Sequence, residues 1–142
     1  MLKLTVNIVL DGNYMPAYAT PGAAGADIRT PVGFILAPGK SFFWPLGILV
    51  EIPEGYEGQL RLRSSLGKGG LTIPQGFGTI DSDYRGPLCG LVYNISDGFI
   101  QVEAGERVFQ LVIAPVVRAD FRVAYKLSET PRGDGGFGST GK

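Results

Sequence analysis

Histidine is absent from the 142-residue chain, and cysteine occurs only once. Histidine is the usual general base near neutral pH and the commonest zinc ligand, so proton transfer must fall to a carboxylate. The single Cys89 permits neither a disulfide within the chain nor a thiolate cluster. Because its neighbours in the run 88–93 are mostly apolar, we expect Cys89 to be a buried, unreactive side chain.

Net charge and long apolar runs are missing as well. The 13 basic and 13 acidic residues cancel, so the chain has no overall field that would attract DNA or RNA, and a small anionic ligand fits better. No stretch approaches the roughly 18 apolar residues of a membrane helix. Every second residue from Leu2 to Leu10 is apolar, which predicts a half-buried strand, whereas an export signal is uniformly apolar. We therefore expect a cytoplasmic location, with no membrane partner and no direct nucleic-acid partner.

Helical periodicity is also lacking, and the short apolar or alternating runs predict an all-β chain. Its length suits one domain. The 22 glycines and 10 prolines supply the turns of a sandwich, barrel or jelly roll. Pro45 inside an apolar run indicates an edge strand or a bulge. We expect strands at 33–36, 42–52, 56–62, 88–95, 107–117 and 121–127.

The chain ends in a glycine-rich segment, RGDGGFGSTGK, at residues 132–142. Glycine leaves backbone amides free to approach an anion, while Arg132, Ser139 and Thr140 add donors and Phe137 adds a ring. This composition suits a nucleotide. Residues 136–142 also fit the P-loop pattern G-x-x-x-x-G-K, but the Ser/Thr and the helix that a P-loop needs do not follow. Considered alone, such a tail is more typical of a disordered end.

The central segment 76–88, GFGTIDSDYRGPL, carries two carboxylates two positions apart. In a strand, Asp81 and Asp83 would point to the same face. At a hairpin tip, which the surrounding glycines favour, one can face a pocket while the other caps the turn. Without histidine, a carboxylate in a pocket can orient and deprotonate a water, and Tyr84 can pack against a sugar. Each residue alone is equally compatible with a structural role in a turn or a strand.

Two further segments carry polar groups. Arg63, Ser64 and Ser65 lie among glycines and suit an oligophosphate, although a solvated loop that leads into a helix is an equally simple interpretation. In the segment 24–29, Asp27 and Arg29 lie on one side of an apolar strand start. Alone, this pair predicts a surface ion pair that contributes little to stability.

Taken together and in order, these segments resemble the five motifs of the trimeric dUTPase family. The resemblance implies an all-β fold of the β-clip or jelly-roll type over residues 1–131 and a flexible lid at 132–142. It also implies a C-terminal arm that reaches a neighbouring subunit, and a homotrimer whose active sites are shared between subunits. The motifs are AGADIRT (24–30), RSSLGKGGL (63–71), GTIDSDYRG (78–86), GERVFQLVIAPV (105–116) and RGDGGFGSTG (132–141).

The activity that the resemblance implies is magnesium-dependent hydrolysis of dUTP to dUMP and diphosphate, which limits uracil incorporation into DNA and supplies dUMP for dTMP synthesis. Asp81 falls on the family's catalytic carboxylate, which activates the attacking water. Tyr84 falls on the aromatic residue that excludes a ribose 2′-hydroxyl by shape. Backbone groups of Gly78, Thr79 and Ile80 match the hairpin that recognises uracil, and Gln75 stands where many members use an asparagine.

On the phosphate side, the resemblance assigns substrate contacts to the second, fourth and fifth motifs. Asp27 matches a carboxylate near the metal, in its second shell, because Mg²⁺ in this family is held mainly by phosphates and waters. Phe137 is expected to stack over uracil when the lid closes. The remaining substrate-binding residues are expected to be Arg63, Ser64, Ser65, Gln110, Arg132, Gly138, Ser139 and Thr140.

Three alternatives compete with this interpretation. Ser65 stands where many members have glycine, which is closer to the related dCTP deaminases, but those enzymes need a glutamate where this chain has Leu91. A non-catalytic, nucleotide-gated binding module stays open, although the intact Asp81 favours catalysis. Integrin-type recognition through residues 132–134 has little support, because the tripeptide RGD often occurs by chance.

Overall fold

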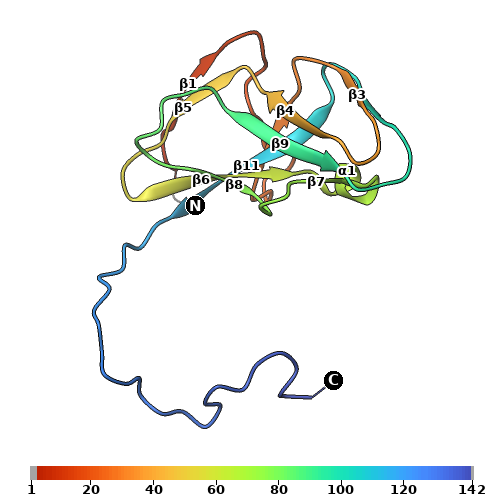
Figure 1. Cartoon of the computed structure of the whole chain (residues 1–142). Helices are drawn as coiled ribbons and strands as arrows, with labels where there is room; N and C mark the ends of the chain where they lie inside the picture. Colours follow the sequence, from red (N-terminus) through yellow and green to blue (C-terminus); the bar gives the residue numbers. More distant parts are fainter. Residues whose placement is uncertain (1–2, 142) are drawn as a thin grey trace.

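The computed structural model describes residues 3–141 and is nearly all-β (Figure 1), as the sequence predicted. The described residues form eleven strands and one short helix. In chain order these are β1 Asn7–Leu10, β2 Ala26–Arg29, β3 Phe34–Leu36, β4 Ser41–Pro45, β5 Ile48–Glu51, β6 Tyr56–Leu62, α1 Ser64–Lys68, β7 Leu71–Thr72, β8 Gly78–Ile80, β9 Cys89–Asn94, β10 Ile100–Val102 and β11 Arg107–Pro115.

All strand pairs of the described residues are antiparallel. The largest sheet has the order β2-β11-β6-β8, and a second sheet has the order β4-β9-β7. Two smaller pairs, β1-β5 and β10-β3, complete the described sheets. In Figure 1, β4 and β9 lie over β11 and β6. This layered, jelly-roll-like arrangement buries an apolar core between sheets.

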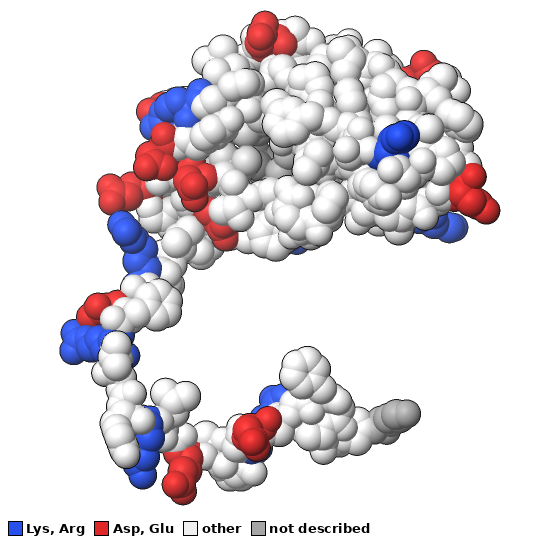
Figure 2. All heavy atoms as spheres, viewed as in Figure 1, with Lys and Arg blue, Asp and Glu red and all other residues white. Residues whose placement is uncertain are grey.

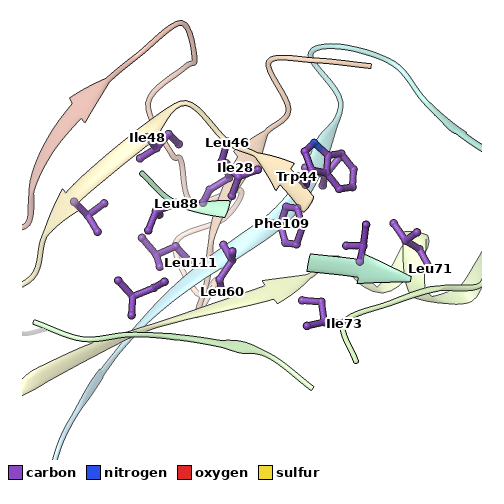
Figure 3. Close-up of a cluster of buried hydrophobic side chains, with 14 of the residues drawn as sticks. Ile28, Trp44, Leu46, Ile48, Leu60, Leu71, Ile73, Leu88, Phe109 and Leu111 are labelled. Atoms are coloured by element: carbon purple, nitrogen blue, oxygen red, sulfur yellow. The ribbon is translucent and has the colours of Figure 1, made fainter. Parts of the chain in front are cut away.

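The core joins the two main sheets through aromatic rings (Figure 3). Trp44 of β4 and Phe109 of β11 are fully buried, and their ring centroids lie 5.1 Å apart in an edge-on arrangement. The indole Nε1 of Trp44 donates a hydrogen bond to Thr30 Oγ1 at 2.7 Å, which satisfies its one polar group. Gly90 of β9 lies against the Phe109 ring, and a Cβ atom there would lie 2.3 Å from Cζ. A side chain at position 90 would therefore force the two sheets apart.

Most of the predicted strands are confirmed with small changes at their ends. The run 42–52 divides into β4 and β5, and β4 is an edge strand, as Pro45 indicated. The N-terminal alternation forms a strand only over Asn7–Leu10, in which Ile8 is half-buried while Val9 is exposed. Leu2 lies outside the described residues. No helix among residues 3–141 is long and apolar enough to cross a membrane.

The strand expected at 121–127 is wrong for the single chain. After β11, the backbone N–H of Val116 still bonds to Gly55 O at 2.9 Å, and the chain then leaves the body (Figure 1). A strand requires a partner for its backbone groups, and no other described segment pairs with 121–127. The apolar residues of this segment therefore stay exposed. We call residues 117–131 the arm and residues 132–141 the lid segment.

Candidate active site

A cavity of about 660 Å³ opens beside β8, and we call it the nucleoside cavity. Strand β8 pairs with β6 on one side only, because it is the edge strand of the largest sheet. The cavity brings together six of the residues predicted from the sequence: Gln75, Gly78, Thr79, Ile80, Asp81 and Tyr84. Strand pairing therefore converts one continuous stretch of sequence into most of a pocket wall.

Asp81 follows directly after β8, where the chain reverses. Ile80 points into the core and is 8% exposed, whereas Asp81 is exposed. The backbone N–H of Tyr84 bonds to Asp81 O at 3.1 Å and closes the turn. Asp83 does not line the nucleoside cavity. The hairpin-tip arrangement is therefore the correct one, and of the two carboxylates Asp81 is the one that lines the nucleoside cavity.

Asp81 also borders a larger cavity, of about 1120 Å³, on the side from which the arm leaves the body. Asp83 lines this second cavity together with Glu51, Glu54 and Glu57. Arg85 pairs with Glu51 at 3.3 Å, and Figure 2 shows acidic and basic side chains side by side at this edge. Asp81 thus borders both the nucleoside cavity, whose wall mixes polar and apolar groups, and a second cavity that carries several charged side chains.

Four residues of the nucleoside cavity were missed by the sequence analysis: Phe43, Phe77, Pro87 and Cys89. Phe77 could have been found, because it lies directly before the GTID segment. Its ring lies 5.7 Å from the guanidinium carbon of Arg61, which is a cation–π contact. Phe43 carries no local signal, since it reaches the cavity only because β4 pairs with β9.

Cys89 is half-buried rather than fully buried, and it lines the nucleoside cavity. Burial raises the pKa of the Cys89 thiol above its ordinary value. The thiol is therefore protonated at neutral pH, and the expected lack of reactivity now has a physical cause.

A buried carboxylate organises the phosphate-binding residues of the prediction. Asp27 is 6% exposed and accepts hydrogen bonds from Arg107 Nη1 at 3.1 Å and from Gln110 Nε2 at 3.2 Å. Arg63 Nε lies 3.5 Å from Oδ1 of the same carboxylate. Antiparallel pairing of β2 with β11 places Gln110 opposite Asp27. A buried carboxylate needs such partners, and it holds them in fixed directions.

The prediction of a surface ion pair between Asp27 and Arg29 is wrong. Arg29 Nη1 instead donates to Gly105 O at 2.7 Å, on the turn before β11. Arg29, Arg63 and Arg107 line a shared cavity of about 500 Å³, in which Glu106 is the one acidic residue of the wall. Three guanidinium groups around one cavity favour an anion. Arg29 and Arg107 were not predicted as site residues, whereas Ser65, which also lines this cavity, was.

Ser64 lies outside these cavities, as the exposed first residue of α1. Arg63 is the N-cap of this helix, in an extended conformation, and it makes no side-chain cap hydrogen bond. The helix that the sequence left as an alternative to a loop is therefore present, and it presents Ser64 and Ser65 to solvent.

The lid segment does not meet either group of residues within the single chain. Figure 2 shows the arm and the lid segment as an extended chain that joins the body only at its root. Arg132 Nε donates to Gly135 O at 2.9 Å, and the ring of Phe137 is fully exposed. Gly138, Ser139 and Thr140 lie in the turns that follow, and Lys142 lies outside the described residues.

The dUTPase family model matches residues 12–141 of the chain. The chain belongs to the dUTPase family. A deoxyuridine 5′-triphosphate nucleotidohydrolase of Roseobacter denitrificans is 50% identical over 131 residues, which cover 89% of this chain and 86% of the relative. The dUTPase of Staphylococcus bacteriophage 80alpha, solved with dUpNHpp, is 28% identical with a TM-score of 0.90, covering 99% of this chain and 100% of the phage chain. These likenesses confirm the family and the fold that the five motifs indicated.

Magnesium is mentioned for another member of the family. The structure of a mutant dUTPase from phage phi11 of S. aureus, 26% identical with a TM-score of 0.78, reveals the coordination of a structural Mg(II) ion, and the match covers 87% of this chain and 98% of that one. Within residues 3–141 of this chain, no group of three or more acidic, histidine or cysteine side chains could hold a metal. The carboxylate of Asp27 is engaged by Arg63, Arg107 and Gln110. The described residues therefore do not fit a resident metal held by a protein cage.

Proposed function

We propose that the chain hydrolyses dUTP to dUMP and diphosphate, with Asp81 as the general base. The observation that supports this most is the position of Asp81. It is an exposed carboxylate at the end of an edge strand, in the wall of a cavity that also contains Tyr84 and the backbone of Gly78–Ile80. Since the chain has no histidine, a carboxylate must accept the proton.

Uracil would be recognised by the backbone of β8. An edge strand keeps one row of N–H and C=O groups without strand partners, and β8 has such a free edge among the described strands. These alternating groups match the alternating acceptors and donor of the uracil edge. Cytosine presents the reversed pattern, and an unpaired buried polar group costs about 1–3 kcal/mol. A pocket closed by backbone around the base would also leave no room for the methyl group of thymine. Substitution of Gln75 would measure what its amide adds to these contacts.

The triphosphate would be held by Arg63 and Arg107, the two cations that pair with Asp27, which we call the cation group. Asp27 fixes Arg63, Arg107 and Gln110, so their donors are oriented before substrate arrives. We propose that Asp27 acts through these side chains. Magnesium would arrive as part of the substrate, bound to the triphosphate, which agrees with the lack of a metal cage among residues 3–141.

In the chemical step, Asp81 would orient a water in line with the α-phosphorus and accept its proton. The water oxygen bonds to phosphorus as the bond to the bridging oxygen breaks, and diphosphate leaves with the electron pair. Arg63, Ser64 and, from the lid segment, Arg132 would stabilise the charge on the phosphates. Phe137 would stack over uracil, and Gly138, Ser139 and Thr140 would help to exclude water.

A homotrimer with shared active sites would bring these groups together. In the single chain, the nucleoside cavity, the cation group and the lid segment are separate. The arm exposes Phe121, Val123, Tyr125 and Leu127, and burying each such side chain contributes about 1.5–3 kcal/mol. We propose that the arm pairs with a neighbouring copy and carries the lid to its site. The cytoplasmic location and the lack of membrane and nucleic-acid partners stay predictions.

Diphosphate release from dUTP, dCTP, dTTP and UTP with Mg²⁺ tests the proposal. Wild type should hydrolyse dUTP selectively, and Asp81→Asn should lose about 10³-fold in turnover, in the range for removing a general base. Binding of dUpNHpp should be retained, because the amide keeps the shape of the carboxylate. Asp83→Asn is the matched control, since Asp83 lies outside the nucleoside cavity.

Two results would contradict the assignment. Full turnover by Asp81→Asn would remove Asp81 as the base. Tight binding of dUpNHpp by a wild-type chain that hydrolyses none of the four nucleotides would favour the nucleotide-gated binding module.

A further inference from the structure

The turn after β8 holds the Tyr84 ring against the backbone of Gly86. A Cβ atom at Gly86 would lie 2.4 Å from Tyr84 Oη, 2.6 Å from Cζ and 2.9 Å from Cε2. The Tyr84 hydroxyl also donates a hydrogen bond to Pro87 O at 3.0 Å. The ring is thus held at its far end by a hydrogen bond and by its close approach to Gly86, and both come from the three residues that follow it.

We infer that Gly86 is a positioning residue that sets the preference for deoxyribose over ribose, because only glycine lets the Tyr84 ring lie in this place. The inference rests on the proposed function and on the role that the family resemblance implies for Tyr84, which is to exclude a ribose 2′-hydroxyl by shape. The Tyr84 ring can exclude the single oxygen atom of a 2′-hydroxyl by shape only if the position of the ring varies by less than the size of that atom. The Oη–Pro87 hydrogen bond and the contact with Gly86 restrict the ring in this way.

An alanine at position 86 would move the ring and leave the fold intact. Gly86 is not among the residues with positive φ, so its backbone can accept a side chain. The atoms in the way are all at the far end of Tyr84, which is 43% exposed and can rotate. Carbon atoms normally approach to about 3.5–4.0 Å, so the ring would have to move by roughly 1 Å or more. A misplacement of that size in a site can cost about 10²-fold in rate.

The selectivity ratio should therefore fall without a matching loss of stability. We expect Gly86→Ala to lower the ratio of kcat/KM for dUTP to that for UTP by at least about 10-fold, and to lower the preference for dUMP over UMP in direct binding. Gly98→Ala is the matched control, because a Cβ at Gly98 meets nothing within 4 Å and its φ is not positive. That variant should keep the wild-type ratio.

The same substitution made in the Tyr84→Ala protein separates the positioning of the Tyr84 ring from other effects of the added methyl group. In Tyr84→Ala, the ring is gone, so selectivity should already be low and adding Gly86→Ala should change it by less than about 2-fold. Equal effects of Gly86→Ala with and without the Tyr84 ring would overturn the inference. So would an unchanged ratio in folded Gly86→Ala.

If Gly86→Ala does not fold, Tyr84→Phe carries the test, because it keeps the ring and removes only the hydrogen bond to Pro87. The ratio should then fall by roughly 3–10-fold, and an unchanged ratio would overturn the inference. The binding comparison of dUMP with UMP does not depend on turnover. A wild-type chain that prefers dUMP but hydrolyses nothing would therefore contradict the proposed function while leaving this inference testable.

Discussion

Strand β11 and the arm lie close together in the sequence and are both rich in apolar residues, yet they differ completely in structure. In β11, Val108, Phe109 and Leu111 are at most 6% exposed because they pack in the core, and β2 and β6 pair with the β11 backbone on both sides. In the arm, Phe121 is 93% and Val123 105% exposed. An apolar segment therefore forms a strand only where a neighbour supplies partners for its backbone hydrogen bonds, and the arm has no such neighbour among the described residues.

The body and the lid segment also differ in whether their chemical groups are brought together within the single chain. The body already holds Asp81 and Tyr84 in one cavity wall, through contacts within the hairpin. The lid segment carries an equally suitable set of groups but has nothing to close over in the single chain. We propose that the arm and the lid segment need a second copy of the chain, whereas the body does not need one to fold, and the following experiments test that difference.

The largest expected effect is from breaking the partner face of the arm. If the arm joins the copies of the proposed trimer, Val123→Asp with Tyr125→Asp should convert it to monomers and lower turnover by about 10³-fold, because the proposed shared sites would be taken apart. Sedimentation equilibrium measures the mass, and circular dichroism should show the β body unchanged. Arg122→Ala with Lys126→Ala alters net charge by the same amount and should stay trimeric. A trimer that survives the aspartates would contradict the role of the arm.

Deleting residues 132–142 should have the next largest effect. Without the lid, the site stays open to water and loses the donors of Arg132, Ser139 and Thr140, so kcat should fall by about 10²-fold. The melting temperature should stay within a few degrees of wild type, since the described lid residues make no contact with the core. An equally active truncation would show that the body is sufficient.

Gly90→Ala should damage the body and leave the tail unaffected. The added methyl group would lie 2.3 Å from the buried Phe109 ring, which cannot rotate away as Tyr84 can. Overpacking of this kind typically costs about 1–3 kcal/mol, to be measured as the free energy of unfolding in urea. Gly86→Ala adds the same methyl group and should cost much less. Equal losses would mean that the exposed turn is as tightly packed as the core.

The smallest effect should come from the Cys89 thiol. Because burial raises its pKa, the thiolate fraction near neutral pH is lower than in the unfolded chain, and iodoacetamide should react slowly. The raised pKa also sets how stability depends on pH. Because the folded state favours the neutral thiol, the free energy of unfolding is slightly higher at lower pH, and it falls as pH rises through the raised pKa. Labelling rates against pH, in native and unfolded protein, check this. Fast native labelling at neutral pH would contradict it.

Much of the fold and half of the site could be predicted because the relevant signals are local. Alternating apolar residues with glycine and proline turns indicated the β class and most strand positions. The nucleoside cavity could be anticipated because one continuous segment, a strand followed by a turn, supplies six of its wall residues. A local signal also predicted the helix at Ser64, but only as an alternative to a loop.

The all-β class, the family and the segment that carries Asp81 could be inferred from the sequence, because they depend on short-range patterns and on the order of the motifs. Contacts between distant residues could not be inferred in this way, because they depend on how the strands pair. Asp27 pairs with Arg107, 80 positions away, and not with Arg29, two positions away. Phe43 and Cys89 reach the nucleoside cavity through the pairing of β4 with β9. Burial and pairing depend on the neighbours that strand register supplies, and for that reason the arm, which has the right pattern but no neighbour, is not a strand.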